Sequence, residues 1–100
     1  MGGIFMLFHI TNRHNYETCG GTTGKSLTPE YNRWIEGNDK VKVLGVWPYN
    51  PMHTIFAVVE SEDYQAVLDL TSDARKCGTS EIVPVVDGFE RREAQGFWGK

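Results

Sequence analysis

Residues 41–60, VKVLGVWPYNPMHTIFAVVE, restrict the fold of this chain through their pattern of apolar side chains. They contain two runs of the β-branched and aromatic residues that are enriched in strands. Pro48, Asn50 and Pro51 favour a turn between the runs, because proline fixes φ and lacks an N–H donor. Neither run alternates apolar with polar residues, as a strand with one wet face would. The pattern therefore predicts a hairpin in a sheet that is covered on both faces.

Side chains two residues apart in a strand share a face of the sheet. Applied strictly, this period gives the two predicted strands four sets of side chains. They are Val41, Val43 and Trp47; Leu44 and Val46; Ile55, Ala57 and Val59; and Phe56 and Val58.

The chain before the hairpin predicts a strand and a helix. Residues 4–11 form an apolar strand, with Phe5, Leu7 and His9 on one face. A glycine- and threonine-rich connection follows, and a helix then begins with Thr28 as N-cap. Tyr31, Trp34 and Ile35 supply the apolar stripe of this helix, and Gly37-Asn38 ends it.

The chain after the hairpin predicts a second helix and a last strand. Ser61 is expected to cap a helix that runs to Arg75-Lys76, with Gly78 as its C′ residue. Residues 80–86 form the last strand, which should lie at an edge because Pro84 removes a hydrogen-bond donor.

This order predicts an α+β fold, the ferredoxin-like β-α-β-β-α-β arrangement with an antiparallel sheet in the order 4-1-3-2. Both helices would cover one face of that sheet. The opposite face would be exposed and would carry Phe5, Leu7, Val43, Trp47, Ile55 and Ala57. An exposed apolar patch of this extent marks an interface, and a two-fold homodimer is the commonest way to cover it.

Length and composition set further limits. One hundred residues form a single domain 1–100, with a core at about 4–86 and a tail at 87–100. The tail carries Phe89, Phe97 and Trp98, which should dock unless the terminus frays. A net charge of −3 without a basic run argues against nucleic acid as a partner. The lack of an apolar run of about 20 residues argues against a membrane span and favours the cytoplasm.

The element order, HTIFAVVESEDYQAV at residues 53–67 and the EIVPVV ending resemble the dimeric α/β-barrel superfamily. The segment from His14 to Cys19 also looks like a His-x-x-x-x-Cys segment of small uncharacterised bacterial-type members. The resemblance implies two sheets packed face to face in a homodimer. The superfamily includes cofactor-free monooxygenases, isomerases and haem-degrading enzymes, so the resemblance implies a fold rather than one reaction.

The predicted strand directions bring four candidate metal ligands to one end of the sheet. These are His14, Cys19, His53 and Cys77, whose imidazole and thiolate groups suit zinc, copper or iron, including haem iron. They lack paired spacing such as C-x-x-C, and the structural alternative is a buried thiol with surface histidines. Residues 19–26 approach a phosphate-binding loop, but Cys19 stands where that motif needs glycine.

Aromatic residues and histidines supply the other candidate site. His9 and His53 are the catalytic candidates, because a histidine that faces a cavity suits acid–base chemistry. His14, Trp47, Tyr49 and Phe56 are the ligand-binding candidates. His9 has the alternative reading of a hydrogen-bonded core or interface residue, and aromatic stripes on strands are often core.

Three functional hypotheses follow. The preferred one is a homodimer that binds a small apolar or aromatic molecule between sheet and helices, in the manner of a monooxygenase or isomerase and without a required cofactor. The second is a transition-metal or haem-binding protein. The third is a non-catalytic regulatory or interaction module. Whether the protein is an enzyme is left open by the sequence.

Overall fold

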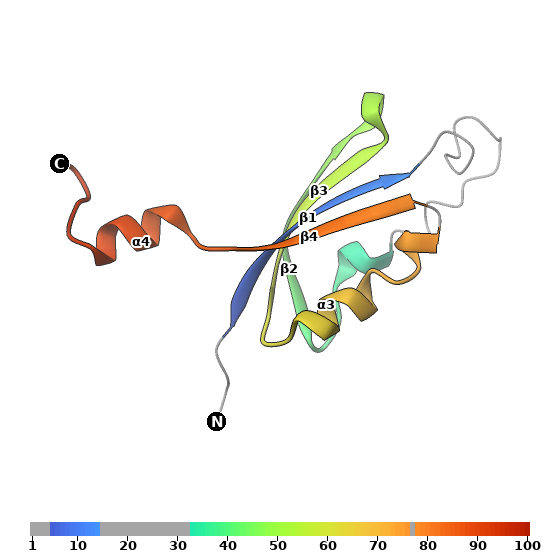
Figure 1. The fold of residues 1–100 in the computed structure, drawn as a ribbon, viewed down its shortest axis with the longest axis horizontal. Coiled ribbons are helices and arrows are strands. Elements are labelled where there is room, and N and C mark those ends of the chain that lie inside the picture. Colours follow the sequence, from blue (N-terminus) through green and yellow to red (C-terminus); the bar gives the residue numbers. More distant parts are fainter. Residues whose placement is uncertain (1–4, 15–32, 77) are drawn as a thin grey trace.

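The structure is a computed structural model of the chain, and it describes residues 5–14, 33–76 and 78–100. Within them the fold is α+β, with one four-stranded antiparallel sheet and two α-helices (Figure 1). The strands are β1 (Met6–His14), β2 (Val41–Tyr49), β3 (Thr54–Ser61) and β4 (Gly78–Val85). The helices are α3 (Tyr64–Leu70) and α4 (Gly88–Ala94), with 3-10 turns η1 (Arg33–Glu36), η2 (Asn50–Met52) and η3 (Ala74–Lys76).

The sheet is built from three antiparallel pairings. Hydrogen bonds join the strands in the order β2-β3-β1-β4, which reads 4-1-3-2 from the other edge. β4 is therefore an edge strand, in keeping with the proline at position 84. Pro48, predicted to lie in the turn, is instead the eighth residue of β2, the other edge strand. The turn itself is made by η2.

A β-bulge changes which side chains of β2 share a face. Val43 pairs with Val59, but the next pair is Gly45 with Val58, so Leu44 is an extra residue. Such an insertion reverses the alternation beyond it. Trp47 therefore lies opposite Phe56 and not on the face of Val41 and Val43, and the prediction that these three share a face is wrong.

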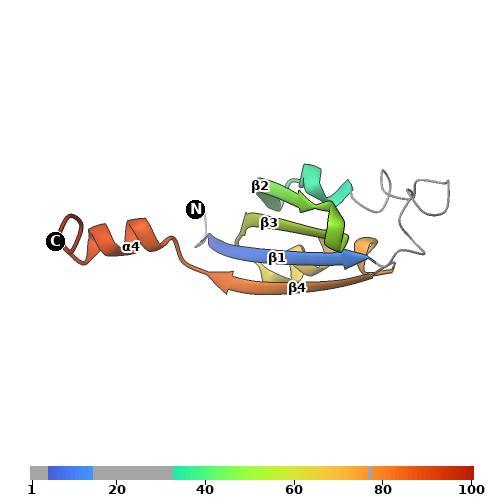
Figure 2. The same ribbon diagram turned by 90° about the horizontal axis from the view of Figure 1, so that it is seen from above.

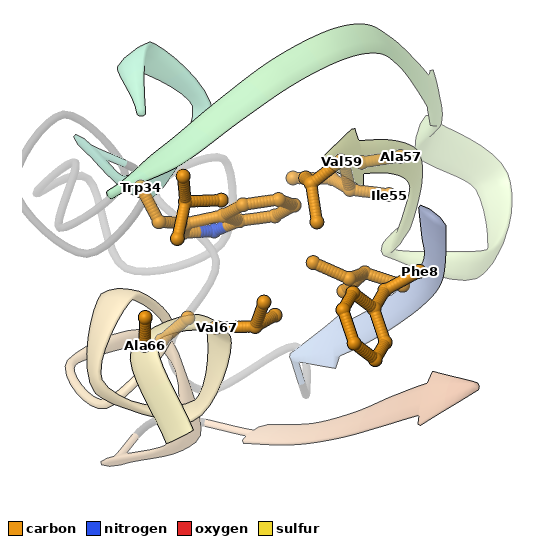
Figure 3. Close-up of a cluster of buried hydrophobic side chains, with 10 residues drawn as sticks. Phe8, Trp34, Ile55, Ala57, Val59, Ala66 and Val67 are labelled. Atoms are coloured by element: carbon orange, nitrogen blue, oxygen red, sulfur yellow. The ribbon is translucent and has the colours of Figure 1, made fainter. Parts of the chain in front are cut away.

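The hydrophobic core fills the space between one face of the sheet and the two elements that cover this face, α3 and η1 (Figure 3). Ile55 and Ala57 belong to it, as does Val43 at its margin, so the prediction that these three lie on the uncovered face is wrong. The Trp34 indole is 3% exposed, and its nitrogen finds no hydrogen-bond acceptor among the described residues. The buried residues of the core are Phe8, Ile10, Trp34, Val41, Ile55, Ala57, Val59, Ala66, Val67 and Ala74.

The second helix is shorter than predicted. Its N-cap is Asp63, whose carboxylate accepts the Gln65 N–H at 3.0 Å, and not Ser61. Ser61 is buried, and its hydroxyl donates to the Lys40 carbonyl at 2.9 Å, which ties β3 to the chain before β2. The helix ends at Leu70, because Thr71 leaves helical geometry and donates its hydroxyl to the Val67 carbonyl at 3.1 Å. Gly78, predicted as the C′ residue, is the first residue of β4.

Several predicted features fall outside the described residues. They are the beginning of the first strand at residue 4, the connection between the first strand and the first helix beyond His14, and the beginning of that helix at Thr28. The described part of the predicted first helix is η1, in which Trp34 is buried and Ile35 is 39% exposed.

Residues 87–100, named here the C-terminal arm, extend past the end of β4 (Figures 1 and 2). Asp87 caps α4 by accepting the N–H groups of Phe89 and Glu90. Phe89 packs against Trp98 with ring centroids 5.4 Å apart, yet the two remain 74% and 52% exposed. The radius of gyration is 15.8 Å, whereas a compact chain of this length would have about 13 Å. The arm thus makes the molecule elongated and buries none of its own side chains.

In the part of the chain that the structure describes, no helix has the length and apolar character needed to cross a membrane.

Candidate functional site

The face of the sheet opposite α3 is rich in apolar side chains and is named here the open face. Trp47, Tyr49 and Val83 on this face are 57%, 51% and 50% exposed. Strand register assigns its members, which are Leu7, His9 and Thr11 of β1, Trp47 and Tyr49 of β2, Phe56 and Val58 of β3, and Val83 and Val85 of β4. The bulge residue Leu44 is 48% exposed and lines a groove together with Leu7 and Val85. Two residues predicted on this face, Leu7 and Trp47, do lie there.

Aromatic side chains cross the open face from β2 to β1. Trp47 pairs directly with Phe56, and the rings of Phe56 and His9 lie 6.1 Å apart at 39°. Tyr49 follows Trp47 by two residues and so shares its face. A Cβ atom at Gly45 would collide with the Trp47 ring, so glycine lets the indole pack against β2. The ligand-binding candidates Trp47, Tyr49 and Phe56 are therefore together with the catalytic candidate His9.

Charged residues of the open face lie toward the two ends of its strands. Lys42 and Glu60 are cross-strand partners at one end. Arg13 and Glu81 extend from β1 and β4 near the other end. The centre between these ends carries apolar side chains and His9. An apolar centre with a polar border is the usual organisation of a protein–protein interface.

A groove of about 1140 Å³ opens where the sheet meets the C-terminal arm. It is continuous with the open face, because Leu7 and Val85 line both. The sequence did not predict this groove, since one of its walls is α4. Its lining residues are Phe5, Met6, Leu7, Leu44, Glu60, Pro84, Val85, Val86, Asp87, Glu90, Arg91 and Ala94.

His14 and His53 meet at the end of the sheet where β1 finishes and β3 begins. The His14 backbone N–H donates to the His53 carbonyl at 3.1 Å. Their ring centroids are 5.1 Å apart, with the rings inclined at 71° in an edge-to-face arrangement. Both residues are partly buried. The strand directions alone predict that these two histidines converge, and the structure places them in contact.

The surroundings of His14 favour its neutral form. Partial burial lowers the pKa of this imidazole below its ordinary value, and the nearby His53 lowers the pKa further. A neutral ring offers a nitrogen lone pair at neutral pH, which both proton transfer and metal binding require.

The two cysteines proposed as metal ligands, Cys19 and Cys77, lie outside the described residues. Within residues 5–14, 33–76 and 78–100, no three His, Cys, Asp or Glu side chains are grouped closely enough to hold a metal. Of the four predicted metal ligands, the structure therefore describes two, His14 and His53.

Asn12 is a polar residue that the sequence interpretation did not single out. It is 2% exposed on the core side of β1, and its amide donates to Ser80 Oγ at 2.9 Å and to the Thr79 carbonyl at 3.3 Å. Its position two and four residues after Ile10 and Phe8 was the available signal, because that period points it inward. These bonds join β1 to β4 next to the histidine pair.

Comparison with known proteins places the chain in a family. Neither the curated proteins nor the solved structures contain a match to it. The family model described as "Domain of unknown function (DUF3303)" matches residues 6–96, which span the sheet and α4. The chain therefore belongs to the DUF3303 family.

Proposed function

We propose that the protein is a homodimer of the dimeric α/β-barrel type, in which two open faces pack together and hold a small apolar or aromatic molecule between them. The observation that carries this proposal is the aromatic row of Trp47, Phe56 and His9 on a sheet face that remains largely exposed in the single chain.

A second copy of the chain is the proposed cover of the open face. Soluble monomers rarely expose a contiguous apolar patch beyond a few hundred Å², and this face draws apolar side chains from all four strands. The charged residues toward its ends, Lys42 and Glu60 at one end and Arg13 and Glu81 at the other, supply the polar border that interfaces have. Two-fold pairing brings identical patches together and closes the assembly at two copies.

The open face is also the better place for a ligand, because the other side of the sheet is filled by the core (Figure 3). Trp47 and Phe56 offer ring surfaces on which an aromatic ligand can stack. The groove beside Leu7 and Val85 adds a concave wall with apolar side chains on the sheet and with Glu90 and Arg91 on the C-terminal arm. Small-molecule sites usually combine such walls with a few polar groups, and His9 is the polar group near the centre.

The ligand proposal is tested by NMR with a library of aromatic fragments. The chain has three tryptophans, so each indole N–H gives one separate reporter signal. Fragment binding is expected to shift the Trp47 signal and leave that of the buried Trp34 unchanged, and Phe56→Leu should weaken the shift at least fivefold. Trp34 serves as the internal control, because its indole lies in the core.

A dimer whose Trp47 signal responds to no fragment would overturn ligand binding. That result would favour the interaction module, since the face would then serve only for pairing. Shifts of Trp34 alone would also contradict the proposal, because they would place the ligand between the sheet and α3.

A further inference from the structure

The pair of His14 and His53 is built by two strand ends and not by a loose surface contact. β1 ends at His14, and β3 begins one residue after His53. The backbone hydrogen bond from His14 to His53, at 3.1 Å, fixes the two main chains beside each other. The two imidazoles therefore project from neighbouring main-chain positions at the same end of the sheet.

His53 has an unusual backbone conformation. Its φ is +49°, and it is the one non-glycine residue with positive φ among those described. Side chains with a Cβ atom rarely adopt this conformation, and such residues are found preferentially at functional sites. Next to it, the Thr54 hydroxyl donates to the Met52 carbonyl at 2.8 Å and holds the turn. The turn thus carries a histidine where asparagine or glycine would be less strained.

We propose that His14 and His53 together bind one divalent transition-metal cation of the zinc type. Imidazole is a ligand suited to zinc, copper, iron and nickel. Two imidazoles that bind one zinc at about 2.0–2.1 Å with a tetrahedral angle place their ring centres roughly 5 Å apart. The centroids of the two rings lie 5.1 Å apart, which matches this separation.

Among the described residues, His14 and His53 are the proposed protein ligands, and the remaining coordination positions fall to other ligands. Both histidines are partly exposed, so water or an external ligand can reach a bound cation. A catalytic zinc site has three protein ligands and a water, and a structural site has four protein ligands, so the histidine pair supplies two of them. This inference is independent of the ligand proposed for the open face, because the histidine pair lies at the end of the sheet.

The test is calorimetric titration of Zn²⁺ into protein that carries no affinity tag and has been stripped with EDTA. One zinc per protomer is expected for the wild type. His14→Gln and His53→Gln should each weaken zinc binding at least tenfold. His9→Gln is the matched control, because His9 is the third histidine of the chain and lies away from the pair; it should bind zinc as the wild type does.

NMR of the imidazole protons shows which rings bind the metal. Zinc should shift the His14 and His53 signals and leave those of His9 unchanged. Circular dichroism of each metal-free variant verifies that it is folded. The inference is overturned if the wild type binds no zinc, or if His14→Gln or His53→Gln binds zinc with the affinity of the wild type.

Discussion

The ring of His14 lies at the end of β1, where partial burial and His53 lower its pKa. Above the ordinary histidine pKa of about 6.5, both folded and unfolded chains hold this ring neutral. As the pH falls below that value, the unfolded chain takes up the proton first, so the folded state loses stability until its own lower pKa is passed. Metal-free wild type should therefore become less stable from pH 7 toward pH 5.

Urea unfolding in the presence of EDTA measures this dependence. His14→Gln should flatten the decline in unfolding free energy below pH 6.5, since glutamine does not titrate. An unchanged pH dependence in His14→Gln would show that another group is responsible.

Gly78 and Gly88 form a matched pair of glycines. A Cβ atom at Gly78 would collide with the backbone of Arg13 in the neighbouring strand, whereas one at Gly88 would meet no atom within 4 Å. Gly78→Ala should cost about 1–3 kcal/mol, as overpacking does. Gly88→Ala should change the unfolding free energy by less than about 0.5 kcal/mol, as surface changes do.

Thermal and urea unfolding of the two glycine variants provide the comparison. Equal stability of the two variants would contradict the close approach of β1 and β4 at Arg13.

At the scale of the elements, the alternation of side chains along β3 was predicted, although Ile55 and Ala57 were placed on the wrong face, and β2 was only partly predicted. Ile55, Ala57 and Val59 alternate with Phe56 and Val58 as the period-two rule requires. In β2 the bulge at Leu44 reverses the alternation, and Gly45 beside it was the one local hint, because glycine in a strand often marks a bulge. Whether a residue is inserted depends on the pairing with β3, which the sequence of β2 alone does not specify.

The sequence interpretation also missed α4, although its end signals were present. Asp87 is a favourable N-cap, and Arg91 and Arg92 lie near the C-terminal end of the helix. The helix was missed because it packs no apolar stripe onto the core, and such a stripe is the main signal for a helix. By contrast, Val67 and Ala66 anchor α3 in the core.

Removal of the C-terminal arm tests the independence of this helix. Since residues 88–100 are all exposed, a chain ending at Asp87 should unfold within about 0.5 kcal/mol of the full chain, as for changes to exposed surface. A chain ending at Ser80 is the control and should not fold, because it lacks most of β4. A large loss of stability in the first truncated chain would show that the arm docks on the sheet.

At the scale of the whole molecule, the predicted topology brings His14 and His53 to the same end of the sheet. Strand directions predict the meeting of His14 and His53, and the rings are in contact. The same reasoning could not place the groove, because it depends on where α4 lies relative to Leu44 and Val85. For the histidine pair and for the groove, topology determines which side chains lie close together and does not determine which ligand binds there.

Two charge insertions separate the open face from the rest of the surface. Leu7→Glu should raise the dimer dissociation constant at least tenfold, because it buries a carboxylate between paired sheets. Ile35→Glu is the matched control, since Ile35 is also apolar, is 39% exposed and lies on η1, on the opposite side of the sheet. Sedimentation velocity over a dilution series compares the two variants, and equal dissociation constants would place the interface elsewhere.

Sedimentation equilibrium of the wild-type chain tests the central claim most directly. The chain has a mass of 11.3 kDa. We expect a particle of twice that mass that is stable across micromolar concentrations, because two copies cover each other's open faces. A particle that keeps the mass of one chain at every concentration would contradict the proposed dimer.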